Sequence, residues 1–102
     1  MVVKWENNAI QDLKEFKSIS QLSNVNNYIL DIVNYVNTLS EYPKLGKIYL
    51  YIQGKIIRQL IYKEHKIFYY LDDEIIHVLT VIHHRQDTQT KINFVKKYFN
   101  NQ

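Results

Sequence analysis

Residues 55–87 read KIIRQLIYKEHKIFYYLDDEIIHVLTVIHHRQD and contain three segments of β-branched and aromatic residues with short polar breaks between them. Such segments are typical of β-strands, and breaks this short connect antiparallel neighbours, because a parallel crossover needs about a dozen residues. A fourth segment of the same kind precedes them. We therefore expect strands at Lys47–Ile52, Ile56–Tyr62, Lys66–Leu71 and Ile75–His83.

The N-terminal part of the chain has the residue spacing of helices. Asn7 or Asn8 can cap a first helix. Its apolar side carries Ala9, Ile10, Leu13 and Phe16. A second helix is predicted by apolar residues that recur at spacings of three and four. These residues are Leu22, Val25, Ile29, Ile32, Val36 and Leu39. Pro43 and Gly46 end this part of the chain, because proline cannot continue a helix and glycine allows a turn.

A short strand is predicted at Val2–Trp5, and a last helix after Asp87 or Thr88, either of which can cap it. Its apolar side carries Ile92, Val95 and Phe99. The order is then β-α-α-β-β-β-β-α in a single domain over residues 1–102. This order predicts an α+β fold in which a helical hairpin packs on a twisted, mainly antiparallel sheet. We expect the helices on one face of that sheet.

Composition narrows the class of protein. With 46% hydrophobic and 23% charged residues, the 102-residue chain resembles ordinary globular proteins. The absence of cysteine excludes disulfides, thiolate metal sites and thiol catalysis. The N-terminus lacks the pattern of a secretion signal, and no apolar run approaches the ~20 residues of a membrane span. We expect a cytoplasmic protein without a membrane partner.

Charge is unevenly distributed along the chain. Residues 1–43 carry two more acidic than basic side chains, whereas residues 44–102 carry five more basic than acidic ones. All four histidines also lie in the second part. Such asymmetry is typical either of a basic surface that faces an acidic or polyanionic partner, or simply of a solvated lysine-rich surface.

Arg58, His83 and Arg85 are the candidate catalytic residues. If Ile75–His83 continues as a regular strand, alternation puts His77, His83 and Arg85 on one face. Metal-free RNA cleavage needs a base, an acid and a cation for the phosphate. His83 could serve as base or acid and the two arginines could hold the phosphate. Alternatively, Arg58 pairs with a carboxylate or backbone carbonyl, and His83 only covers the end of the sheet.

Two other kinds of site are less well supported. A histidine metal site is disfavoured, because His77 and His83 would lie roughly 20 Å apart along a strand and the adjacent His83 and His84 would point to opposite faces. It would need a bend at the end of the strand and help from His65. The nine tyrosines could stack on nucleic-acid bases, but their positions favour the core or a protein interface. We therefore expect no metal ligands and no cofactor.

Several short motifs follow one another along the chain. They are Trp5 with Ala9, Asp12 and Leu13, then Leu39, Pro43 and Gly46, then Ile57-Arg58-Gln59-Leu60, Lys66-Ile67-Phe68-Tyr69 and His83-His84-Arg85-Gln86-Asp87. In this order they resemble the RelE/ParE family of bacterial toxins of type II toxin–antitoxin systems. The ending, a histidine followed two residues later by arginine and then by aspartate, is more similar to the ParE branch than to the RelE branch.

This resemblance implies a toxin that inhibits bacterial growth and stabilises plasmids, neutralised by an antitoxin with an acidic or amphipathic segment. ParE-like members are associated with inhibition of DNA gyrase, and RelE-like members cleave mRNA on the ribosome without metal. Only Arg58, His83 and Arg85 match positions that could serve a nuclease, and Gln86 stands where the family often has a second arginine. Gyrase inhibition is therefore the leading hypothesis. A metal-independent endoribonuclease and a non-toxic protein-binding adaptor remain the alternatives.

Overall fold

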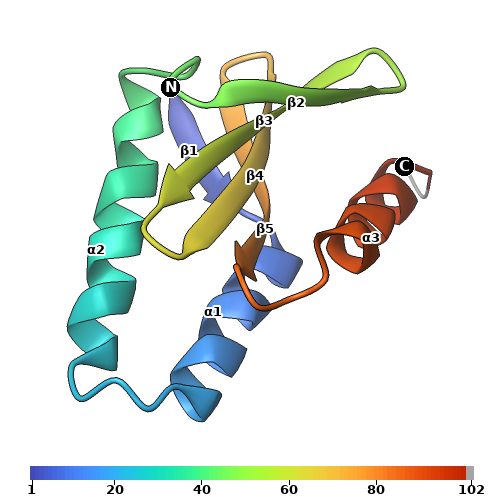
Figure 1. The fold of residues 1–102 in the computed structure, drawn as a ribbon. Helices are drawn as coiled ribbons and strands as arrows, with labels where there is room; N and C mark the ends of the chain where they lie inside the picture. Colours follow the sequence, from blue (N-terminus) through green and yellow to red (C-terminus); the bar gives the residue numbers. More distant parts are fainter. Residues whose placement is uncertain (101–102) are drawn as a thin grey trace.

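The computed structural model describes residues 1–100 and confirms the order β-α-α-β-β-β-β-α and the α+β class. The strands form one five-stranded sheet in the order β1-β5-β4-β3-β2 (Figure 1). β1 pairs with β5 in parallel, and the other pairs are antiparallel. The elements are β1 (Val2–Trp5), α1 (Asn7–Ile19), α2 (Val25–Asn37), the 3-10 turn η1 (Thr38–Ser40), β2 (Lys47–Ile52), β3 (Lys55–Tyr62), β4 (His65–Asp72), β5 (Ile75–His83) and α3 (Thr88–Asn100).

Tight two-residue turns connect the strands β2 to β5. Gln53 and Gly54 both have positive φ (48° and 79°), which is the backbone of the hairpin turns that match the natural twist of the strands. Lys63 and Asp73 also have positive φ in their turns. The predicted bounds of β2 and β5 are confirmed. β3 and β4 begin one residue earlier than expected, because the turns are as short as two residues, and β4 also ends one residue later than expected, at Asp72.

The starts of the helices differ from the expectation in two cases. Glu6, not Asn7 or Asn8, is the residue at the N-cap of α1, and its side chain makes no capping bond. α2 begins only at Val25, so Leu22 lies in the preceding loop and is 52% exposed. The cap of α3 is as expected, because Asp87 accepts hydrogen bonds from the Gln89 N–H (3.0 Å) and the Thr90 hydroxyl (2.8 Å).

Helices cover both faces of the sheet, which corrects the expectation of one covered face. Figure 1 shows α3 apart from α1 and α2. One hydrophobic core joins α1 and α2 to Ile67 and Tyr69 of β4. The second core joins α3 to Phe68 and Tyr70, which alternate with those residues on the same strand. The reason is that β4 and β5 are apolar on both faces, and each face must be shielded from water.

A β-bulge in β5 changes which side chains share a face. Phe68 lies opposite Thr80 but the next residue, Tyr69, lies opposite Val78, so β5 has one residue more than β4 at this point. As a result His77 stacks on Tyr70 on the α3 side (ring centroids 4.7 Å apart). The expectation that His77 and His83 share a face is therefore wrong, because it assumed strict alternation through the bulge.

Asp12 of α1 replaces a missing strand neighbour of β5. β1 pairs only with residues 75–78, so the C-terminal part of β5 has no strand on that side. There the carboxylate of Asp12 accepts hydrogen bonds from the Val81 N–H (2.9 Å) and the Thr80 hydroxyl (2.6 Å). It also forms an ion pair with Lys91 of α3 (2.6 Å). With its side chain only 8% exposed, this single carboxylate connects both helical layers to the sheet.

Replacement of Asp12 by alanine should therefore be costly. Asp12→Ala leaves Lys91 without its partner and the Val81 N–H without its acceptor, and we expect the free energy of unfolding to fall by about 3 kcal/mol. Asp31→Ala, an exposed carboxylate on α2, is the matched control and should change it by less than about 0.5 kcal/mol. Urea denaturation measures both, and equal losses would contradict the role of Asp12.

Gly46, just before β2, lies where a side chain has no room. Its N–H donates to the Tyr69 hydroxyl (2.8 Å), which itself donates to the carbonyl of Pro43 (2.9 Å). A Cβ at this position would lie 2.8 Å from the Gln59 carbonyl oxygen and 2.8 Å from the Tyr69 ring. The position requires glycine because of this close approach.

We expect Gly46→Ala to lower the free energy of unfolding by about 2–3 kcal/mol, because backbone and a buried ring must move. Gly54→Ala is the matched control. It also adds one methyl group, but in open space, and only the positive φ of 79° is unfavourable, at about 1 kcal/mol. Thermal or urea denaturation of the two variants checks this order, and a larger effect at Gly54 would refute it.

Candidate functional site

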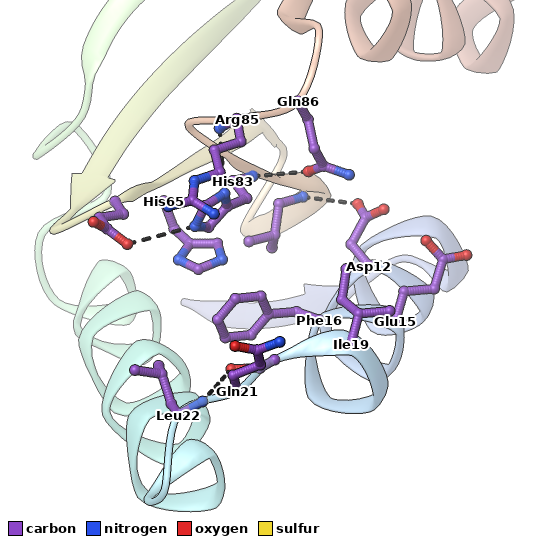
Figure 2. Close-up of a pocket in the computed structure, with 13 residues that line it drawn as sticks. Asp12, Glu15, Phe16, Ile19, Gln21, Leu22, His65, His83, Arg85 and Gln86 are labelled. Carbon is purple, nitrogen blue, oxygen red and sulfur yellow. Dashed lines mark hydrogen bonds and ion pairs between the residues drawn. The ribbon is translucent and has the colours of Figure 1, made fainter.

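A cavity of about 560 Å³ opens between α1, the α1–α2 loop, the start of β4 and the end of β5 (Figure 2). We refer to it as the α1–β5 cavity. Apolar and titratable side chains both line it. The lining residues are Asp12, Glu15, Phe16, Ile19, Ser20, Gln21, Leu22, Glu64, His65, Val81, His83, Arg85 and Gln86. Two of the three candidate catalytic residues, His83 and Arg85, therefore lie at one cavity.

Several contacts fix the position of His83 at the end of β5. Its backbone N–H donates to Gln86 Oε1 (2.8 Å), and its Nδ1 accepts a hydrogen bond from the Arg85 N–H (3.2 Å). Its Nε2 lies 3.5 Å from a carboxylate oxygen of Glu64, and its ring stacks on Phe16. Both ring nitrogens are thus engaged, whereas a general base needs one nitrogen free to face the substrate.

Arg58 lies at a different place in the sheet. Its Nη1 donates to the carbonyl of Gly46 (2.8 Å), which is the carbonyl pairing considered as an alternative for this residue. Arg58 is opposite Tyr69, whereas His65, beside His83, is opposite Tyr62. Four residues along β3 correspond to roughly 13 Å. The structure therefore brings His83 and Arg85 together at the α1–β5 cavity, but not Arg58.

His65 also lines this site, although the sequence indicated it only as a possible contributor to a disfavoured histidine metal site. It is only 2% exposed, because the two-residue turn makes it the first residue of β4 rather than part of the turn. Its Nδ1 is hydrogen-bonded to the Tyr28 hydroxyl (2.8 Å), and its Nε2 has no hydrogen-bond partner within residues 1–100. Burial, reinforced by the nearby His83, lowers the pKa of His65 to about 4. Its imidazole is therefore neutral at pH 7.

Strict strand geometry predicts that the adjacent His83 and His84 point to opposite faces, but in the structure their rings lie side by side. β5 ends at His83 and the chain turns at His84, so the two ring centroids are only 4.4 Å apart. One carboxylate oxygen of Glu64 lies 3.5 Å from His83 Nε2 and 3.9 Å from His84 Nδ1. Glu64 and His83 line the α1–β5 cavity, and His84 lies beside them.

The tyrosines divide between the core and the surface. Tyr69 and Tyr70 are buried, and Tyr28, Tyr35 and Tyr62 pack against the core. This agrees with the core positions that their spacing favours. Three other tyrosines remain exposed, namely Tyr42, Tyr49 and Tyr51. Within the described part of the chain, no helix is both long and apolar enough to cross a membrane.

A family model described as "ParE toxin of type II toxin-antitoxin system, parDE" matches residues 3–88. The match extends from β1 to the start of α3 and includes every residue of the α1–β5 cavity. No curated protein matches the chain.

The lowered pKa of His65 predicts a pH dependence of stability. Between about pH 6.5 and pH 4 the unfolded chain takes up a proton on this imidazole while the folded chain does not, so acid favours unfolding. From pH 7.5 to pH 4.5 this group alone should lower the free energy of unfolding by about 2–3 kcal/mol.

His65→Gln removes the titrating imidazole. Between pH 7.5 and pH 4.5 the free energy of unfolding of this variant should therefore fall by about 2–3 kcal/mol less than that of the wild type. Urea denaturation at the two pH values measures the difference. Parallel pH profiles for His65→Gln and the wild type would show that His65 titrates normally in the folded protein.

Proposed function

Because the chain belongs to the ParE toxin family of type II toxin–antitoxin systems, we propose that it inhibits bacterial growth in the cytoplasm by binding DNA gyrase. An antitoxin with an acidic or amphipathic segment would neutralise it, and such a pair would stabilise a plasmid that carries it. The family membership supports the toxin role itself. The choice of gyrase depends on how the candidate catalytic groups are arranged.

The observation that carries this choice is the separation of Arg58 from His83 and Arg85. RNA cleavage needs a base, an acid and a cation at one phosphate. Arg58 is bound to the Gly46 carbonyl instead, and both nitrogens of His83 are engaged. The buried, neutral His65 makes no contact with solvent through its free nitrogen. A toxin that acts by binding needs no such catalytic group, so this geometry favours binding over cleavage.

The surface of β2 supports binding to a protein. β2 is the outer strand of the sheet, so one of its edges has backbone groups without a strand partner. Ile48, Tyr49 and Tyr51 of this strand are exposed, with Tyr51 67% accessible to solvent. Exposed apolar side chains beside an open strand edge are typical of protein-binding surfaces. The basic excess of residues 44–102 favours an acidic partner segment.

A ribosome-dependent endoribonuclease is the second candidate. It is favoured by one observation, namely that His83 and Arg85 line the same cavity. In this case Arg85 alone would supply the cation that holds the phosphate, because Arg58 lies elsewhere in the sheet. A non-toxic adaptor has less support, because the family to which the chain belongs is one of toxins.

Controlled expression in a bacterial host, without an antitoxin, tests the proposal. We expect growth arrest, and we expect the purified protein to inhibit supercoiling by gyrase at concentrations that leave other topoisomerases active. His83→Ala should retain both effects, since binding does not need a catalytic imidazole. Mapping of transcript ends after induction should reveal no new cleavage sites.

The matched control is His84→Ala, which removes the neighbouring exposed imidazole but none of the candidate catalytic groups. New transcript ends that disappear in His83→Ala and persist in His84→Ala would establish the nuclease instead. Normal growth with abundant folded protein, together with uninhibited gyrase, would refute the proposed function.

A further inference from the structure

Three potential metal ligands lie close together, and two of them, Glu64 and His83, line the α1–β5 cavity. Glu64, His83 and His84 each place one ligand atom so that these atoms lie within 4.8 Å of one another. We propose that these side chains bind a divalent transition-metal ion of the zinc type, with Glu64 as a carboxylate ligand and the two histidines as imidazole ligands.

The distances are close to those that such an ion requires. Zinc forms bonds of about 2.0–2.1 Å to nitrogen and oxygen, so ligand atoms of a tetrahedral site are roughly 3.3 Å apart. The Glu64 oxygen is 3.5 Å from His83 Nε2 and 3.9 Å from His84 Nδ1. Small rotations of exposed side chains are enough to close the site, since Glu64 is 65% exposed and His84 47% exposed.

The backbone holds the three residues in position before an ion binds. The two segments that carry the ligands are joined by a hydrogen bond from the His84 N–H to the Glu64 carbonyl (2.8 Å). The antiparallel pair of His65 with His83 aligns the start of β4 with the end of β5. Stacking on Phe16 restricts the ring of His83. Ligands that are already ordered lose less entropy on binding.

The chemistry of the ligands selects the class of ion. Imidazole nitrogen favours zinc, nickel and copper, whereas calcium and magnesium prefer sites made of oxygen ligands. His83 must then carry its proton on Nδ1, which gives up the 3.2 Å hydrogen bond from the Arg85 N–H. The loss of this hydrogen bond lowers the affinity, and so does the fourth coordination position, which none of the three protein ligands fills. We therefore expect micromolar affinity, weaker than that of a structural zinc site with four protein ligands.

A bound ion would link the turn between β3 and β4 to the turn between β5 and α3. Both turns border the α1–β5 cavity (Figure 2). The ion would therefore fix the mouth of this cavity and stabilise the folded chain, since it binds the folded state preferentially.

Calorimetric titration of the tag-free, EDTA-treated protein with zinc chloride tests the site directly. We expect one ion per chain, a dissociation constant in the micromolar range and a higher Tm in the presence of zinc. Magnesium at the same concentration should have no effect. Glu64→Gln, His83→Gln and His84→Asn should each weaken zinc binding at least about tenfold, because each removes a direct ligand.

Glu15→Gln is the matched control, since it neutralises an exposed carboxylate of the same cavity that is not a ligand, and it should bind zinc like the wild type. The side chains of Glu64 and His84 are exposed, so their substitution leaves the core intact, and circular dichroism checks that these variants fold. The absence of binding at about 100 micromolar zinc, a concentration well above the expected dissociation constant, overturns the proposal. Unchanged affinity in any of the three ligand variants overturns it as well.

Discussion

The carboxylate of Asp12 is the contact on which the arrangement of this domain depends. Beyond Val78, β5 has no neighbouring strand on its β1 side, and a buried N–H without an acceptor is costly. Asp12 supplies that acceptor from α1 and at the same time pairs with Lys91 of α3. One side chain thus stabilises the bulged strand, holds α1 against it and connects the helix of the opposite face.

The bulge that Asp12 stabilises also determines which side chains line the α1–β5 cavity. The extra residue in β5 directs His77 towards Tyr70 and α3, and it leaves His83 facing Phe16 of α1. The turn that follows the end of β5 at His83 then directs His84 back towards Glu64. A regular strand would have divided these groups differently between the two faces. The local irregularity, more than the topology, explains why three titratable side chains meet there.

Much of the fold could be predicted from the sequence, because strand segments, turn residues and the Asp87 cap are local signals. The sequence does not indicate which face of the sheet α3 covers, since its apolar residues Ile92, Val95 and Phe99 fit either face. The bulge at Leu79 has no glycine or other marker in the sequence, so the face of His83 relative to His77 could not be derived. The partner of Arg58 depends on the loop at Gly46, which is distant along the chain.

The open edge of β2 leaves a binding surface uncovered in the free protein. An uncovered strand with Ile48, Tyr49 and Tyr51 at the surface can pair with the same strand of another copy. The irregular register between Ile48 and Leu50 interrupts this edge and so slows such pairing without abolishing it. The uncovered edge therefore favours self-association of the free protein, and a partner that covered this edge would also keep the protein in solution.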